Sequence, residues 1–192
     1  MREPARSGLV TGLTLAVMLA AYPLVMPSYQ WAVRTAANVV LEGGYPRLHV
    51  EPIEGGGWRI FRSLPDRTEA RVFSIPARSL AQIHLAIILL PALLFGVPSP
   101  LRQRIRRVGL GCALLYGLQV GLLVIFVKAW LHYQQTDPGD LFYNWLTLLH
   151  STLGQLGAAA IWVLLAWPIL LRTIAAGVAM PSPSTAGGRK RA

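Results

Sequence analysis

The residues best suited to chemistry in this sequence border its long apolar runs. His84 begins one run, Lys128 and His132 end another, and His150 stands before a third, near Gln155. Ionisable groups are costly inside a bilayer, so several of them at one depth could form a proton-transfer or anion-binding site. In a second interpretation, these side chains reach the lipid headgroups or link helices by hydrogen bonds. The sequence leaves both interpretations of this candidate polar cluster open.

The single cysteine, Cys112, has a different setting. It lies about one helical turn from an arginine-rich segment, whereas the histidines lie at the other ends of the runs, so we expect no Cys–His pair. Cys112, Tyr116 and Gln119 are spaced by four and three residues and therefore share one helical face. We interpret this face as a packing surface. Close helix contacts are also predicted at the glycines Gly117, Gly121, Gly154 and Gly157.

Common catalytic and metal-binding patterns do not occur in the sequence. It contains no H-E-x-x-H, no G-x-S-x-G, no Walker loop, no G-x-G-x-x-G and no C-x-x-C. The glycines 55–57 read as a turn, because no helix with a lysine follows them. We therefore predict no catalytic residue, no metal site and no cofactor, and the sequence favours a protein that is not an enzyme.

The hydrophobic composition indicates that the segments carrying these residues lie in a lipid bilayer. Of 192 residues, 54% are hydrophobic and 14% are charged, and the mean hydropathy is +0.47. Such a chain has too little polar surface for a globule in water. Four runs approach the roughly 20 apolar residues that a helix needs to cross a bilayer. They cover about 8–26, 80–97, 108–131 and a stretch that begins after 149 and ends near 171.

The distribution of charge predicts the orientation of these spans. The formal net charge is +10. The two ends of the chain and the link between the second and third runs hold ten cations and one acid, or +9. Positive charge beside a span stays in the cytoplasm, so we predict that both termini are cytoplasmic and that the chain is a multi-pass membrane protein. Because topology accounts for the basic residues, we expect membrane lipids as partners and no nucleic acid.

The segment 28–79 is predicted to lie outside the membrane. Its first part has the apolar stripe of an interfacial helix, and the rest alternates apolar and polar residues in about three short strands joined by turns. The sequence thus predicts an α-helical integral membrane protein with four transmembrane helices and a small extracytoplasmic β-meander between helices one and two. The domains are an anchor helix (1–27), this outer segment (28–79), a three-helix membrane bundle (80–177) and a disordered basic cytoplasmic tail (178–192).

Two stretches carry a resemblance to a known family. They are the join between the last strand and the second span, VFSIPARSLAQIHLAIILLPALLF, and the aromatic entry to the last span, LFYNWLTLLHSTLGQLG. With the layout of the chain, they resemble the exosortase H-associated membrane proteins. The resemblance implies an accessory in the inner membrane of a Gram-negative bacterium, whose partner is an exosortase that processes carboxyl-terminal sorting signals.

Three hypotheses for function follow. The leading one is a non-catalytic accessory protein that docks another integral membrane protein, such as an exosortase, or a passenger protein. The competing one is a small membrane enzyme or transport subunit that uses His84, Lys128, His132 and His150 near the outer membrane face. The third is a purely structural assembly factor.

Overall fold

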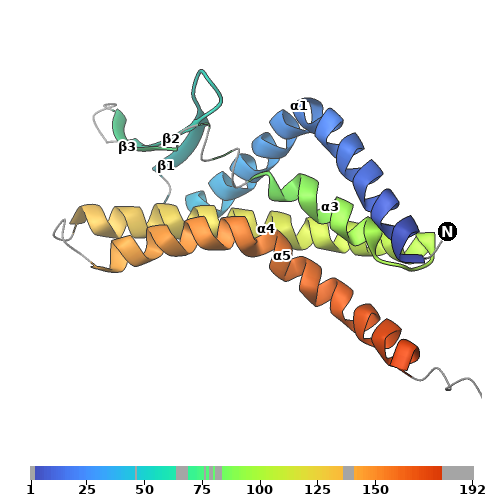
Figure 1. Cartoon of the computed structure of the whole chain (residues 1–192). Helices are drawn as coiled ribbons and strands as arrows, with labels where there is room; N and C mark the ends of the chain where they lie inside the picture. The colour runs from blue at the N-terminus through green and yellow to red at the C-terminus, as the bar shows by residue number, and fades with distance from the viewer. Residues whose placement is uncertain are drawn as a thin grey trace, which may run out of the picture.

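The computed structural model describes residues 3–45, 47–63, 69–75, 77, 80, 84–135 and 141–178. Within them the chain forms four helices and a three-stranded sheet (Figure 1). In chain order these are α1 (Glu3–Gly44), β1 (Leu48–Pro52), β2 (Trp58–Ser63), β3 (Glu69–Ile75), α3 (Ala86–Gly96), α4 (Leu101–Gln135) and α5 (Leu141–Val178). The predicted combination of four helices with a β-meander after the first is confirmed. The predicted disordered tail, 178–192, lies outside the described residues except for its first residue.

Helix α1 differs from the prediction, because it is one helix of 42 residues where we expected an anchor followed by a separate interfacial helix. It bends sharply midway (Figure 1), and Pro23 and Pro27 lie inside it. A proline lacks the N–H that an internal turn needs and clashes with the carbonyl four residues earlier, so the pair accounts for the bend. Beyond the prolines, Val33, Ala37 and Leu41 are buried in a core shared with the sheet, and this packing stabilises the continued helix.

The sheet has the antiparallel order β1-β2-β3. The turn between β1 and β2 contains Gly55 and Gly56, whose φ angles of 91° and 86° lie in the left-handed region that favours glycine. Val50 pairs with Ile60, and the register between β2 and β3 shifts after Ile60. The three strands and the glycine turn therefore form where the alternation in the sequence predicted them.

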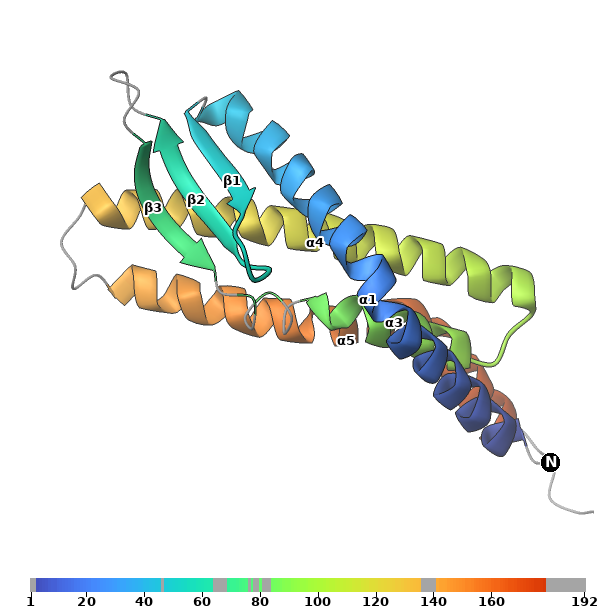
Figure 2. The same cartoon turned by 90° about the horizontal axis from the view of Figure 1, so that it is seen from above.

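The sheet is built onto the helices through a shared hydrophobic core. Figure 2 shows it beside the second half of α1 and across α4. Asn38 of α1 binds the β1 backbone twice: its Nδ2 donates to the Val50 carbonyl at 3.1 Å, and its Oδ1 accepts from the Val50 N–H at 2.9 Å. The buried residues of this first core come from α1, the sheet, the segment before α3, and α4: Val33, Ala37, Leu41, Leu48, Val50, Trp58, Ile60, Ile75, Leu80, Leu123, Val124 and Val127.

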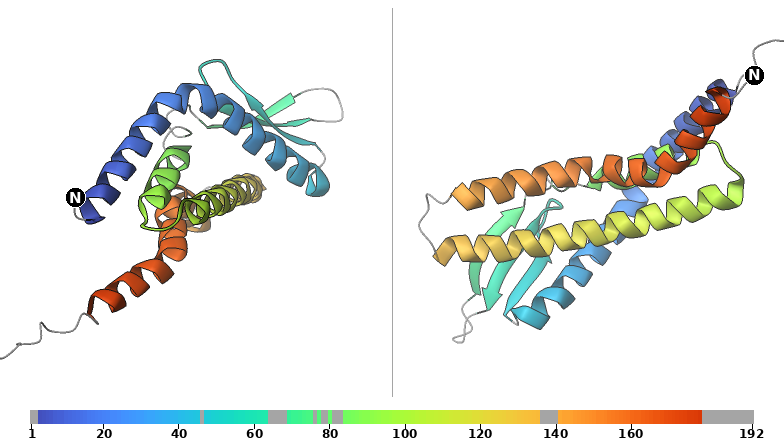
Figure 3. Two further views of the ribbon diagram at one scale, coloured as in Figure 1. Left: turned by 90° about the vertical axis from the view of Figure 1, so that its right-hand side faces the viewer. Right: turned by 90° about the horizontal axis from the view of Figure 1, so that it is seen from below.

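Helix α3 is short and lies within the helical layer. Its 11 residues rise about 16 Å at 1.5 Å per residue, whereas the second apolar run of the sequence covers 80–97. Leu90 and Leu94 of α3 are fully buried in a second core with Leu115 of α4 and Ile161 of α5. Helices α4 and α5 run side by side at the end of the molecule that carries the sheet, and α5 then bends away (Figure 3).

Two helical segments among the described residues are long and apolar enough to cross a membrane: Gly8–Gly44 and Leu101–Ala129. The apolar segments Ala86–Gly96 and Leu156–Arg172 are shorter. Large apolar side chains such as Leu24 and Leu164 are exposed on the helices, at 80% and 71% of their surface. By length and composition, two helices are therefore candidate membrane spans.

Candidate functional site

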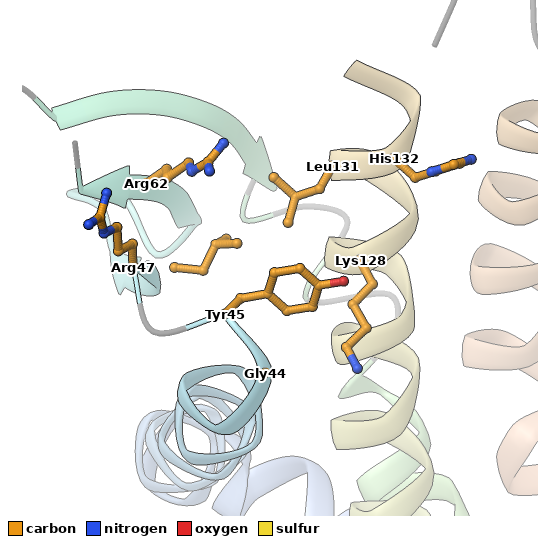
Figure 4. Close-up of a pocket in the computed structure, with 8 residues that line it drawn as sticks. Gly44, Tyr45, Arg47, Arg62, Lys128, Leu131 and His132 are labelled. Atoms are coloured by element: carbon orange, nitrogen blue, oxygen red, sulfur yellow. The ribbon is translucent and has the colours of Figure 1, made fainter. Parts of the chain in front are cut away.

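Polar side chains gather at two places in the described structure, and the first is a pocket of about 350 Å³. It lies where α1 ends, where β1 begins and beside the last turns of α4 (Figure 4). We name it the basic pocket. Its lining residues are Gly44, Tyr45, Arg47, Leu48, Arg62, Lys128, Leu131 and His132.

Three cationic side chains from different parts of the chain line the basic pocket, and the Lys128 ammonium points away from the two guanidinium groups, beyond the Tyr45 ring (Figure 4). Arg47 precedes β1, Arg62 lies in β2, and Lys128 lies in α4. The Lys128 ammonium is 5.6 Å from the centre of the Tyr45 ring, a cation–π contact. His132 borders the pocket, but its imidazole points from α4 away from the sheet (Figure 4). In the described part of the chain, no carboxylate forms an ion pair with Arg47, Arg62 or Lys128.

The strand register explains why Arg62 reaches the pocket. Arg62 pairs with Leu48 across β1 and β2, and it follows Trp58 and Ile60 at intervals of two residues. Residues at this spacing face the same side of a strand. Trp58 and Ile60 are buried in the first core, whereas Arg62 is exposed. Arg62 is therefore the last residue on the side of β2 that faces the helices, and it lies at the edge of the core.

The second gathering of polar groups is a buried cluster between α1 and α4. The Tyr29 hydroxyl donates to Gln119 Oε1 at 2.6 Å, and the Tyr116 hydroxyl donates to the Ala32 carbonyl at 3.1 Å. The Tyr29 and Tyr116 rings meet edge to face, with centroids 6.3 Å apart. These bonds fix the position of α1 just beyond its bend, so the cluster links two helices rather than facing solvent.

His84 completes this buried polar cluster and is 1% exposed. The Gln30 amide nitrogen lies 3.3 Å from His84 Nδ1. The amide nitrogen donates to Nδ1 in the tautomer that carries the ring proton on Nε2. The imidazole also contacts the rings of Tyr29 and Trp58, each with centroids 5.5 Å apart. His84 thus connects α1 to the inner face of the sheet.

A small cavity lies beside His84 and Gln119. Its volume is about 20 Å³, and Val33, Trp58 and Leu123 are among its apolar lining residues. A space of this size holds about one water molecule when polar groups border it. The imidazole and the amide are the polar groups here, so the cavity suits a single bridging water and is too small for an organic substrate.

The residues of the predicted candidate polar cluster lie in different places. Lys128 and His132, one turn apart on α4, both line the basic pocket, whereas His84 lies in the buried polar cluster. The backbones of His150 and Gln155 belong to α5, and their side chains lie outside the described residues. The described members of the predicted set therefore divide between two cavities.

Sequence reasoning missed several residues of both sites. Arg47 and Arg62 entered it only as contributions to the charge of the outer segment, and Tyr29 only as part of an apolar stripe. The alternation of β2 was a usable signal for Arg62, since Trp58, Ile60 and Arg62 share one face. No periodicity in the sequence indicates the Tyr29–Gln119 bond, because its partners are 90 residues apart.

The predicted packing residues also differ in their surroundings. Tyr116 and Gln119 contact α1 as described above, and Cys112 packs partly buried against the second core. A Cβ atom built on Gly157 would lie 2.6 Å from Leu118 Cδ2, so α4 approaches α5 closely there. Among the described residues, nothing lies within 4 Å of a Cβ atom at Gly117 or Gly121, so neither forms a close helix contact within the chain. The surroundings of Gly154 lie outside the described residues.

Within the described residues, no three His, Cys, Asp or Glu side chains are grouped so that they could hold a metal ion. No protein-family model, curated protein or solved structure matches the chain.

Proposed function

We propose that this chain is a non-catalytic accessory protein of the bacterial inner membrane, and that it docks a second integral membrane protein such as an exosortase. All four helices are integrated in the bilayer, and both termini are cytoplasmic. The sheet lies at the outer face and presents its docking surface. The observation that carries this proposal is the core shared by α1, α4 and the sheet, because it holds a small sheet at a fixed place beside two apolar helices.

The surroundings of the short helix α3 support membrane integration of the second span. Helix α3 is about half as long as a 30 Å hydrocarbon layer is thick, so the preceding segment must cross the rest. A polar side chain at membrane depth is tolerated where protein covers it. Leu80 and His84 in this segment are 2% and 1% exposed. The sheet, α1 and α4 supply the cover, since Leu80 belongs to their core.

The outer face of the sheet supports a docking role for a protein partner. His49 and Glu51 of β1, with Arg59 and Phe61 of β2, alternate with the core residues. Glu51 and Arg59 form an exposed ion pair with an N···O distance of 3.8 Å, and the Arg59 guanidinium lies 5.5 Å from the Phe61 ring centre. A polar, solvent-accessible face is typical of the rim of a protein interface.

The competing hypothesis of an enzyme or transport subunit uses His84, Lys128, His132 and His150, and the structure describes the side chains of the first three. Among the described residues, His84 lines a cavity of about 20 Å³, and the other two line the basic pocket. That division gives the competing hypothesis no common reaction centre, so we do not propose it.

Site-specific photo-crosslinking in the native membrane tests the docking proposal. A benzophenone side chain is placed at Glu51, on the outer face of β1, and in a matched control at Leu164, which is exposed on α5. We expect Glu51 to give one multi-span membrane protein whose sequence carries a sortase-like cysteine, arginine and histidine set. Products that are the same from both positions, or lipid adducts alone at Glu51, contradict the proposal.

A further inference from the structure

The basic pocket combines positive charge with a shape that no described acidic side chain fills. Arg47, Arg62 and Lys128 come from separate elements, so their approach is a product of the fold and not of neighbouring positions in the chain. Like charges that line one pocket repel one another, and an anion bound there offsets this repulsion. In the described structure, the π-face of Tyr45 is the partner of Lys128, and it carries no charge to neutralise the set.

The helix ends beside the pocket offset only part of this charge. Gly44 is the last residue of α1 and lines the pocket, and His132 lies in the last turn of α4. Each helix carboxyl terminus contributes about half a negative charge, so the two together amount to about one. Three cationic side chains exceed that amount, and the pocket keeps a net positive potential that favours an anionic ligand.

The geometry of the donors and the apolar lining narrow the class of ligand. Two guanidinium groups can each hold two oxygens of a phosphate in a planar, bidentate fashion, and an ammonium adds a point charge. Leu48, Leu131 and the Tyr45 ring supply an apolar wall. A volume of about 350 Å³ lies at the small end of ligand sites, so it suits a headgroup and not a whole lipid.

We propose that the basic pocket binds a phosphate group, either that of an anionic phospholipid headgroup or free phosphate. Arg47 and Arg62 hold the phosphate oxygens, and Lys128 adds charge from α4. Phosphate binding is inferred from the residues of the pocket alone. The location of the pocket at the outer membrane surface rests on the proposed function. Arg62 extends from β2 and Lys128 from α4, so a bound phosphate would join the sheet to the helices.

Calorimetric titration of the full-length protein in a nonionic detergent tests the proposal. The probes are dihexanoyl phosphatidylglycerol, inorganic phosphate, and dihexanoylglycerol, which has the same acyl chains without phosphate. The variant R47Q/R62Q removes two cations from the pocket. The matched control R102Q/R106Q removes two exposed arginines of α4 that do not line the pocket.

We expect the phosphatidylglycerol affinity to fall at least about tenfold in R47Q/R62Q, because each cation near anionic lipid contributes about fivefold. It should stay within about twofold in R102Q/R106Q. Competition by inorganic phosphate supports free phosphate as the source, and binding of the lipid alone supports the headgroup. Equal loss in both variants, or dihexanoylglycerol binding as tightly as phosphatidylglycerol, overturns the proposal. These binding measurements do not involve a partner protein. Failure of phosphate binding can therefore be distinguished from failure of the docking proposal.

Discussion

The hydroxyl of Tyr29 and the side-chain amide of Gln119 form a hydrogen bond of 2.6 Å that joins α1 to α4. Gln119 is 4% exposed, so the bond is shielded from bulk solvent. Tyr29 also meets the ring of His84, and His84 meets Trp58 of the sheet. One tyrosine thus connects the bend of α1 to both the helical layer and the sheet.

Replacement Tyr29→Phe keeps the ring and removes the hydroxyl that donates to Gln119. We expect the protein to lose about 1 kcal/mol of stability, because a buried acceptor loses a donor, and the apparent Tm in detergent to fall by about 2–4 °C. Tyr22→Phe is the matched control on the same helix: Tyr22 is partly buried in the second core and its hydroxyl has no hydrogen bond to a described residue. An equal fall in both variants would show that the bond contributes nothing.

Replacement His84→Ala tests the role of the imidazole in holding the sheet. The substitution removes two ring contacts and the bond with Gln30, and it enlarges a cavity of about 20 Å³. We expect a loss of about 2 kcal/mol or more and faster amide hydrogen exchange in β2. His49→Ala, on the outer face of β1, should change stability by less than about 1 kcal/mol. Unchanged exchange in β2 of His84→Ala would contradict a link from His84 to the sheet.

The strands and the long apolar helices could be predicted because they depend on local patterns. Val50 and Ile60 alternate with charged residues, and Gly55 with Gly56 supplies the left-handed turn. The long apolar runs likewise indicate helices without knowledge of their neighbours. Hydrophobic periodicity and turn chemistry act within a few residues, and the sequence displays both directly.

The separation of the polar residues into two sites could not be predicted in this way. His84 and Lys128 lie at similar distances from the ends of apolar runs. Their predicted depth in the bilayer is therefore the same, and the sequence analysis placed them in one cluster. The short α3 and the sheet above it place His84 beneath Trp58 instead. Gly117 and Gly157 also look alike in sequence, yet among the described residues only Gly157 has a helix against it. Such differences depend on which elements pack together, and that is a tertiary property.

Arg104 has a structural role that the charge count does not reveal. Its Nε donates to the Ser99 carbonyl at 2.7 Å, and its guanidinium donates to the Phe95 carbonyl at 3.2 Å. It therefore satisfies one of the orphan carbonyls at the end of α3. We expect Arg104→Gln to lower the apparent Tm through the loss of about 1–2 kcal/mol, measured by thermal unfolding in detergent. Arg102→Gln removes the same charge from an exposed residue for which the structure gives no hydrogen bond to described residues, and it should leave the Tm unchanged.

The proposed orientation can be tested with engineered cysteines, since Cys112 is the only native one. In a Cys112→Ala background, Glu54→Cys places a thiol at the exposed turn after β1, and Gln103→Cys places one at the exposed start of α4. An excess of arginine keeps a short link in the cytoplasm, so a membrane-impermeant maleimide should label Glu54→Cys in intact spheroplasts. It should label Gln103→Cys only after permeabilisation. Labelling of Gln103→Cys alone would show the reverse orientation. Labelling of both positions in intact spheroplasts would contradict membrane insertion, because the proposal places them on opposite sides of the membrane.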